Sequence, residues 1–215
     1  MRFRLTYDGE LRPTQRDEHK LAPHKHIIRK VFHKQLKYLW LTNQFLCNHR
    51  VFPEHGPLNF PVGSFTGVWG GGEERKISLN DYTAARYHEF GYRFVPLVRE
   101  ELSLSCSLSI LFLRRDIPGS VIHAGDLDNR IKTIIDALRR PRNADDLAGH
   151  KTPENGEDPF YCLLEDDKQV THLEVETDTL LDLPTEDAAD QRRARLIITV
   201  EIRPMDVTMF NLSFA

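Results

Sequence analysis

The residues best suited to chemistry lie in two acidic stretches that are far apart in the chain. Asp126 and Asp128 are two residues apart, and Lys132 follows Asp128 by four. Asp166 and Asp167 form the second stretch. Carboxylates held close together repel one another when both are ionised, so they share a proton or bind a cation. Mg²⁺ binds through one or two carboxylates and accepts phosphate oxygens as further ligands. We therefore expect Asp126, Asp128 and Asp167 to hold Mg²⁺, or Mn²⁺ as the alternative ion. Asp166 is a neighbouring acidic ligand, and Lys132 lies beside the metal.

Hydrophobic periodicity predicts the elements that position these carboxylates. From Asp126 onward, apolar residues are spaced for one face of a helix, and Asp128, Lys132 and Asp136 form a polar stripe on another face. Alternating apolar residues predict one strand over residues 102–113 and another over residues 170–176. We therefore expect the carboxylates at one edge of a sheet. The apolar helix positions are Leu127, Ile131, Ile134, Ile135 and Leu138.

The remaining pattern predicts an α/β (α+β) fold, a mixed β-sheet flanked by helices. A strand opens the chain at residues 2–7, a helix covers residues 24–40, and a strand covers residues 196–202. With 215 residues, the chain is expected to form a single domain, residues 1–215. Insertions are expected near residues 43–80 and 142–159, and we interpret the second as a mobile loop near the site.

Positive charge is concentrated in parts of the chain, although the formal net charge is only -3. Residues 2–50 are rich in Lys and Arg, a second basic group follows the carboxylates, and residues 145–190 are mainly acidic. Basic segments beside a carboxylate cluster favour a polyanionic substrate. The alternative is a solvated basic face without a partner. The candidate nucleic-acid-binding residues are Lys25, Arg29, Lys30, Lys34, Lys37, Arg139, Arg140 and Arg142.

Several protein classes are disfavoured by the sequence. No apolar run approaches the roughly 18 residues of a membrane span, so we expect no membrane partner. The three cysteines are far apart, and the N-terminus lacks the apolar core of a secretory signal, which favours a reducing cytoplasmic location. The histidines and the cysteine between residues 24 and 49 lack the paired spacing of a zinc site.

Four motifs resemble those of the RusA-like Holliday junction resolvases. They are Gly125-Asp126-Leu127-Asp128-Asn129, then Lys132, then Asp136-Ala137-Leu138, and finally Asp166-Asp167-Lys168-Gln169-Val170. The resemblance covers about residues 93–203. It implies a RusA-like fold with inserted loops and a homodimer that cuts branched DNA with Mg²⁺ during recombination and repair. It also places the metal ligands at Asp126, Asp128 and Asp167 and the functional lysine at Lys132.

The resulting hypothesis is a metal-dependent endodeoxyribonuclease that hydrolyses phosphodiester bonds in branched DNA. One alternative is a nuclease of related fold that acts on other DNA or on RNA in a mobile-element or anti-phage setting. Another is a junction-binding protein that does not cleave. Simpler structural roles also remain: Asp126 or Asp128 can cap the helix, and Lys132 can pair with Asp128 or Asp136. For Asp136 we favour an ion pair or a dimer contact over a metal ligand.

Overall fold

The computed structural model describes residues 1–13, 18–53, 56–57, 76–115, 126–182, 193–208 and 210–215. The side chains of residues 18–20 and 126 also lie outside the described part. Within it, the chain has mixed α+β content, as the sequence predicts.

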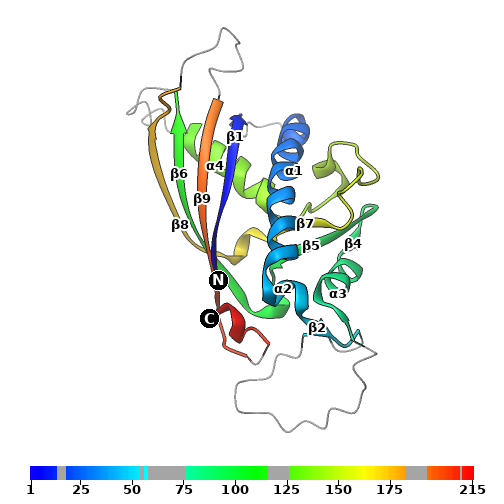
Figure 1. Ribbon diagram of the computed structural model, residues 1–215. Coiled ribbons are helices and arrows are strands. Elements are labelled where there is room, and N and C mark those ends of the chain that lie inside the picture. The colour runs from blue at the N-terminus through cyan, green and yellow to red at the C-terminus, as the bar shows by residue number, and fades with distance from the viewer. Residues whose placement is uncertain (14–17, 54–55, 58–75, 116–125, 183–192, 209) are drawn as a thin grey trace.

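A four-stranded sheet, called the main sheet below, carries the longest strands (Figure 1). Its strand order is β1-β9-β6-β8. The pairs β1–β9 and β9–β6 are antiparallel, whereas β6 and β8 are parallel. The strands are β1 (Arg2–Glu10), β6 (Leu104–Arg114), β8 (Val170–Thr179) and β9 (Arg193–Pro204). Each overlaps a strand predicted from alternation, and β8 forms one edge of the sheet.

Alternation explains why these strands form one half-buried sheet. In β6 the side chains at even positions from Leu104 to Phe112 are fully buried, and the serines between them face outward. β9 repeats this pattern with Leu196, Ile198, Val200 and Ile202. One face of the main sheet therefore contributes to the core, and the other faces solvent.

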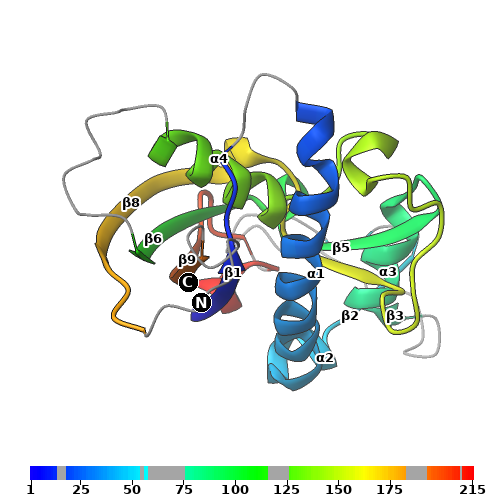
Figure 2. The same cartoon turned by 90° about the horizontal axis from the view of Figure 1, so that it is seen from above.

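A second, three-stranded sheet has the order β4-β5-β7, with β5 and β7 parallel. Helix α1 lies between this sheet and the main sheet (Figure 2). The strands and helices of this part are β4 (His88–Glu89), β5 (Tyr92–Val98), β7 (Phe160–Leu164), α1 (Glu18–Thr42) and α4 (Asp126–Leu138). The shorter elements are α2 (Gln44–Asn48), β2 (Arg50–Val51), β3 (Ile77–Ser78), α3 (Leu79–Arg86), and the 3₁₀ helices η2 (Glu100–Leu102), η4 (Ala144–Leu147), η5 (Asp167–Gln169) and η7 (Leu212–Phe214).

Helix α1 begins earlier than the sequence predicts, at Glu18 rather than near His24, and it contains Pro23. A proline inside a helix removes one backbone hydrogen bond and its ring crowds the carbonyl four residues earlier, at a cost of about 3 kcal/mol. The packing of Ile28, Phe32 and Leu36 into the core outweighs that loss.

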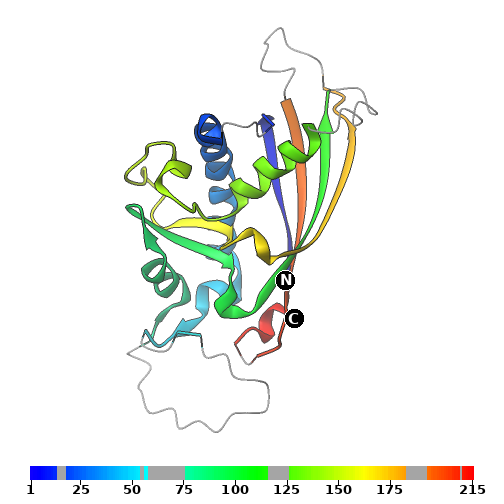
Figure 3. The same ribbon diagram turned by 180° about the vertical axis from the view of Figure 1, so that it is seen from behind.

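Helix α4 follows β6 in the chain and lies across the main sheet (Figure 3). Ile131, Ile134 and Leu138 are buried, whereas Asp128 and Lys132 are exposed, so the predicted polar stripe begins at the surface. α4 also contacts α1.

The structure describes the second expected insertion in full and the first only in part. Residues 58–75, in the middle of the first, lie outside the described residues, and α2, β2, β3 and α3 flank that gap. Residues 142–159, which we predicted as a loop near the site, begin beside Asp167 through Arg142 and make several contacts with the rest of the fold. They contain η4, Leu147 is fully buried, and His33 and Lys37 of α1 contact the carbonyl oxygen of Gly156. Among the described residues, no helix is long and apolar enough to cross a membrane.

Candidate active site

A pocket of about 560 Å³ lies between α4, η5 and β8. Its polar rim consists of Asp128, Lys132, Asp136 and Asp167. The structure therefore brings residues from the two distant acidic stretches to one place. Asp126 begins α4, but its side chain lies outside the described residues.

Asp128 is held at this pocket by the amphipathic character of α4. It is the third residue of the helix, and it is exposed. Because an N-cap residue precedes the first helical residue, Asp128 does not cap α4, and one of the simpler interpretations is wrong for this residue. Lys132 lies one turn further on, on the same stripe.

The second acidic stretch is fixed by a capping box. The Asp166 side chain accepts a hydrogen bond from the Lys168 backbone N–H at 3.0 Å, and the Gln169 side chain accepts one from the Asp166 backbone N–H at 3.1 Å. The hydrogen bond from Lys168 lowers the pKa of Asp166, and the nearby Arg142 acts in the same direction. Asp166 is thus a helix cap that directs the next residue, Asp167, to the pocket.

Arg142 pairs with the second acidic stretch. Its Nη2 lies 2.7 Å from Asp167 Oδ1 and 3.4 Å from Asp166 Oδ2. The Arg142 backbone N–H donates to Asp146 Oδ2 at 2.9 Å, which anchors the arginine on the segment that follows α4. We predicted that Arg142 binds DNA, but in this structure its guanidinium is paired with these carboxylates.

Asp136, the last residue of the polar stripe, is in a buried ion network. Lys25 Nζ lies 2.6 Å from Asp136 Oδ2, and Arg139 Nε lies 3.2 Å from Asp136 Oδ1. Burial alone would raise the pKa of Asp136, but Lys25 and Arg139 outweigh burial, and the pKa is lowered. Arg29, which is fully buried, donates to the Asp136 carbonyl oxygen at 3.0 Å. The ion pair favoured for Asp136 is confirmed, and it joins α1 to α4.

The donor set of the pocket fits a hard divalent cation. Asp128 and Asp167 supply carboxylate oxygens on its rim, and Mg²⁺ and Mn²⁺ prefer oxygen ligands. Among the described side chains, no group of three His, Cys, Asp or Glu residues is arranged for a metal ion. The third expected ligand, Asp126, is not among those side chains.

Most of the predicted nucleic-acid-binding residues have intramolecular partners. Lys25, Arg29 and Arg139 are buried, so they are not part of an exposed basic face, and the premise of that prediction is wrong for them. Lys30 pairs with Glu154 and Glu157, Lys37 donates to Gly156, and Arg140 pairs with Glu89 over the Tyr87 ring. Lys34 is exposed. The sequence could not distinguish these outcomes, because a charge run does not reveal which members face other elements.

His26 and His33 of α1 take part in packing. His33 Nδ1 accepts the Tyr161 N–H at 2.9 Å, and the His33 ring lies 4.4 Å from that of Phe160. His26 packs against His150 and Phe160. Burial is the main cause that lowers the pKa of His26 to about 3.

Sequence reasoning overlooked the apolar side of the pocket. Leu173 and Val175 of β8 face Leu127, Ile131 and Ile135 of α4 across it. The signal was present in the alternation of β8, where residues 173 and 175 must share a face.

Comparison of the chain with protein-family models, curated proteins and solved structures gave no match. The proposal below therefore rests on the residues and their geometry.

Proposed function

We propose that this protein is a RusA-like, Mg²⁺-dependent endonuclease that cleaves branched DNA. The observation that carries the proposal is the meeting of Asp128, Lys132 and Asp167 around one pocket. Carboxylates from two distant segments together with a lysine form a set suited to phosphodiester hydrolysis. The four sequence motifs add the resemblance to the RusA-like family. In that family the assembly is a homodimer, and two active sites related by a twofold axis suit a symmetric junction.

In the proposed mechanism, Asp128 and Asp167 hold the cation, together with Asp126. When bound, Mg²⁺ activates water and stabilises charge on the scissile phosphate. Lys132 is exposed on the rim and donates to a phosphate oxygen. Asp166 keeps η5 in place through its cap and orients Asp167.

The experiment that tests this proposal compares a four-way junction, a linear duplex and single-stranded RNA, each with Mg²⁺ and with a chelator. We expect Mg²⁺-dependent cleavage of the junction, and we expect Asp128→Asn to abolish cleavage while binding is retained or tightened. Preferential cleavage of RNA would contradict the substrate assignment. Junction binding without cleavage by the unmodified protein would favour the non-cleaving binder.

A further inference from the structure

The pocket has a wall that the proposed hydrolysis does not use. Besides its charged rim, the described lining of the pocket is aliphatic, and Leu173 is 41% exposed. Each Å² of apolar surface left in water forgoes roughly 25 cal/mol. Ile131 belongs to the core and Leu127, Ile135 and Val175 pack against it, so Leu173 is the exposed member of the wall. An exposed aliphatic side chain beside charged groups in a pocket offers a ligand an apolar contact. The wall consists of Leu127, Ile131, Ile135, Leu173 and Val175.

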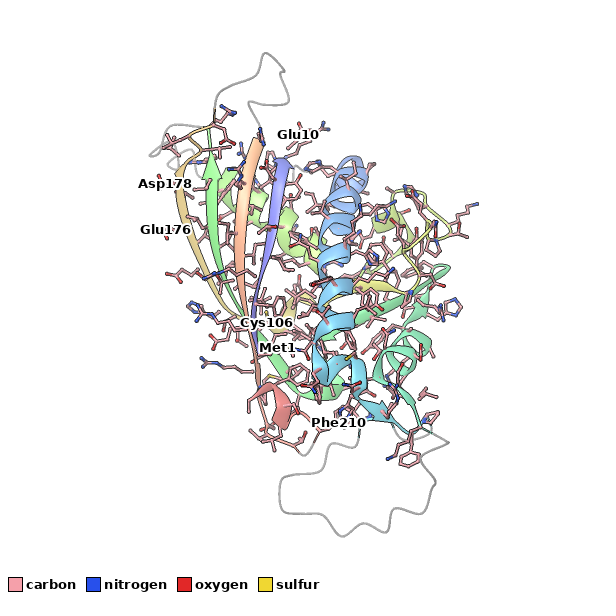
Figure 4. The ribbon with its side chains drawn as sticks, in the orientation of Figure 1. Met1, Glu10, Cys106, Glu176, Asp178 and Phe210 are labelled. Atoms are coloured by element: carbon pink, nitrogen blue, oxygen red, sulfur yellow. The ribbon has the colours of Figure 1, made fainter. Side chains whose placement is uncertain are left out.

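The register of β8 keeps its acidic side chains off this wall. Glu174 accepts a hydrogen bond from Ser109 Oγ at 3.2 Å, on the face of the main sheet opposite the pocket. Figure 4 shows Glu176 and Asp178 at the outer edge of the sheet. Leu173 and Val175 alternate with these residues and face the pocket. The strand thus offers the pocket apolar contacts.

We propose that this wall receives an unpaired nucleobase next to the phosphate that is cleaved, an inference that rests on the proposed function. A phosphate gains nothing from aliphatic side chains, whereas the faces of a base are uncharged and pack against apolar groups. The volume of about 560 Å³ lies within the range of about 300–1,000 Å³ typical of small-ligand sites. A ligand that reaches Asp128 and Lys132 with its phosphate brings its base to the adjoining wall.

This assignment explains how one pocket could select branched substrates. Moving a base out of a duplex costs a few kcal/mol, and the cost is smallest where the base is already unpaired. Flaps carry unpaired bases, and a base pair at the open crossover of a junction lacks a stacking neighbour on one side, so a base leaves the helix more easily there than inside a linear duplex. The wall therefore favours branched DNA without reading its sequence.

Fluorescence of 2-aminopurine tests the inference without cleavage. The base analogue is placed at the branch of a four-way junction and, as control, inside a linear duplex, with Ca²⁺ in place of Mg²⁺. We expect binding to protect the junction probe from acrylamide quenching at least threefold. Leu173→Thr places a β-branched, strand-compatible residue in β8, shortens the apolar side chain and should remove this protection. The matched control is Leu181→Thr, at a residue that is 90% exposed and outside the pocket.

Several outcomes would overturn the inference. One is that acrylamide quenches the probe equally in the free and the protein-bound junction. Another is that the Leu173→Thr and Leu181→Thr proteins protect the probe equally, while circular dichroism shows that both are folded. Should Leu173→Thr fail to fold, Val175→Ala provides the same comparison. If a second copy of the chain covered the wall instead, light scattering would show a dimer mass that is lost in Leu173→Thr, and acrylamide quenching of the probe would not change.

The test separates this inference from the proposed function. A protected base in a protein that cleaves nothing with Mg²⁺ or Mn²⁺ would contradict the nuclease and support the base site. The opposite result is also possible: the protein cleaves the junction, the base stays unprotected, and Leu173→Thr prefers junction over duplex as strongly as the unmodified protein does. That result would support the nuclease and contradict the base site.

Discussion

Arg142 Nη2 lies 2.7 Å from Oδ1 of Asp167, a carboxylate on the rim of the proposed metal site. The guanidinium thus neutralises negative charge where we expect a divalent cation to bind. A cation and an arginine that share one carboxylate compete for it, and this competition can be measured.

Arg142→Ala is expected to raise the affinity for Mn²⁺ about tenfold without DNA, because a competing positive charge is removed. Isothermal titration calorimetry measures this affinity. Because the Arg142 side chain is 51% exposed, the free energy of unfolding should change by less than about 1 kcal/mol. Arg203→Ala is the control, since it removes an exposed arginine paired with Glu201 instead. Weaker Mn²⁺ binding by Arg142→Ala would mean that Arg142 positions Asp167 rather than competing with the ion.

Lys132→Met is expected to slow junction cleavage by roughly 10²–10³-fold, the usual effect of losing one donor to developing charge. Methionine has a similar length but cannot donate to a phosphate oxygen. Lys151→Met, at an exposed position between η4 and β7, is the matched control and should cleave normally. Single-turnover kinetics provide the measurement. Equal rates for the two variants would exclude Lys132 from the chemistry.

Asp136→Asn should lower the free energy of unfolding by about 3–5 kcal/mol, because Lys25 would be left buried without its counter-charge and Arg139 would keep only its longer contact with Asp146. Urea denaturation measures the loss. Asp8→Asn removes an exposed carboxylate paired with Arg193 and Arg195, and it should cost less than about 1 kcal/mol. If Asp136→Asn lowered the free energy of unfolding no more than Asp8→Asn does, the ion network would not be what joins α1 to α4.

His26 should make stability depend on pH. Its buried ring, whose nitrogens have no hydrogen-bond partner among the described residues, has a pKa lowered to about 3. Between roughly pH 6.5 and this value, the unfolded chain binds a proton that the folded protein does not. Stability should therefore fall on acidification, by up to about 1.4 kcal/mol per pH unit for this residue.

His26→Phe tests this dependence, because phenylalanine keeps the ring packing against Phe160 and removes the titrating group. The slope of unfolding free energy against pH between 6.5 and 4 should become smaller. His172→Gln, at an exposed position of β8, should leave the slope unchanged. An unchanged slope in His26→Phe would mean that His26 is protonated in the folded protein.

Local patterns predicted the strands of the main sheet and helix α4 because each element buries one face, which leaves a period of two or of 3.6 in the sequence. They also predicted that the two acidic stretches would come near each other, and Asp128, Lys132 and Asp167 line one pocket. Charge alone could not predict that Lys25 pairs with Asp136, since that contact depends on how α1 crosses α4. The anchoring of residues 142–159 depends likewise on distant partners such as Lys37 and Gly156.

The most direct measurement of the central claim is anomalous diffraction from a crystal soaked in Mn²⁺. We predict a manganese peak within direct coordination distance, about 2.0–2.3 Å, of carboxylate oxygens from both Asp128 and Asp167. Asp128→Asn crystals should have a weaker peak or none. Manganese bound only elsewhere, or Asp128 and Asp167 too far apart to share an ion, would contradict the account.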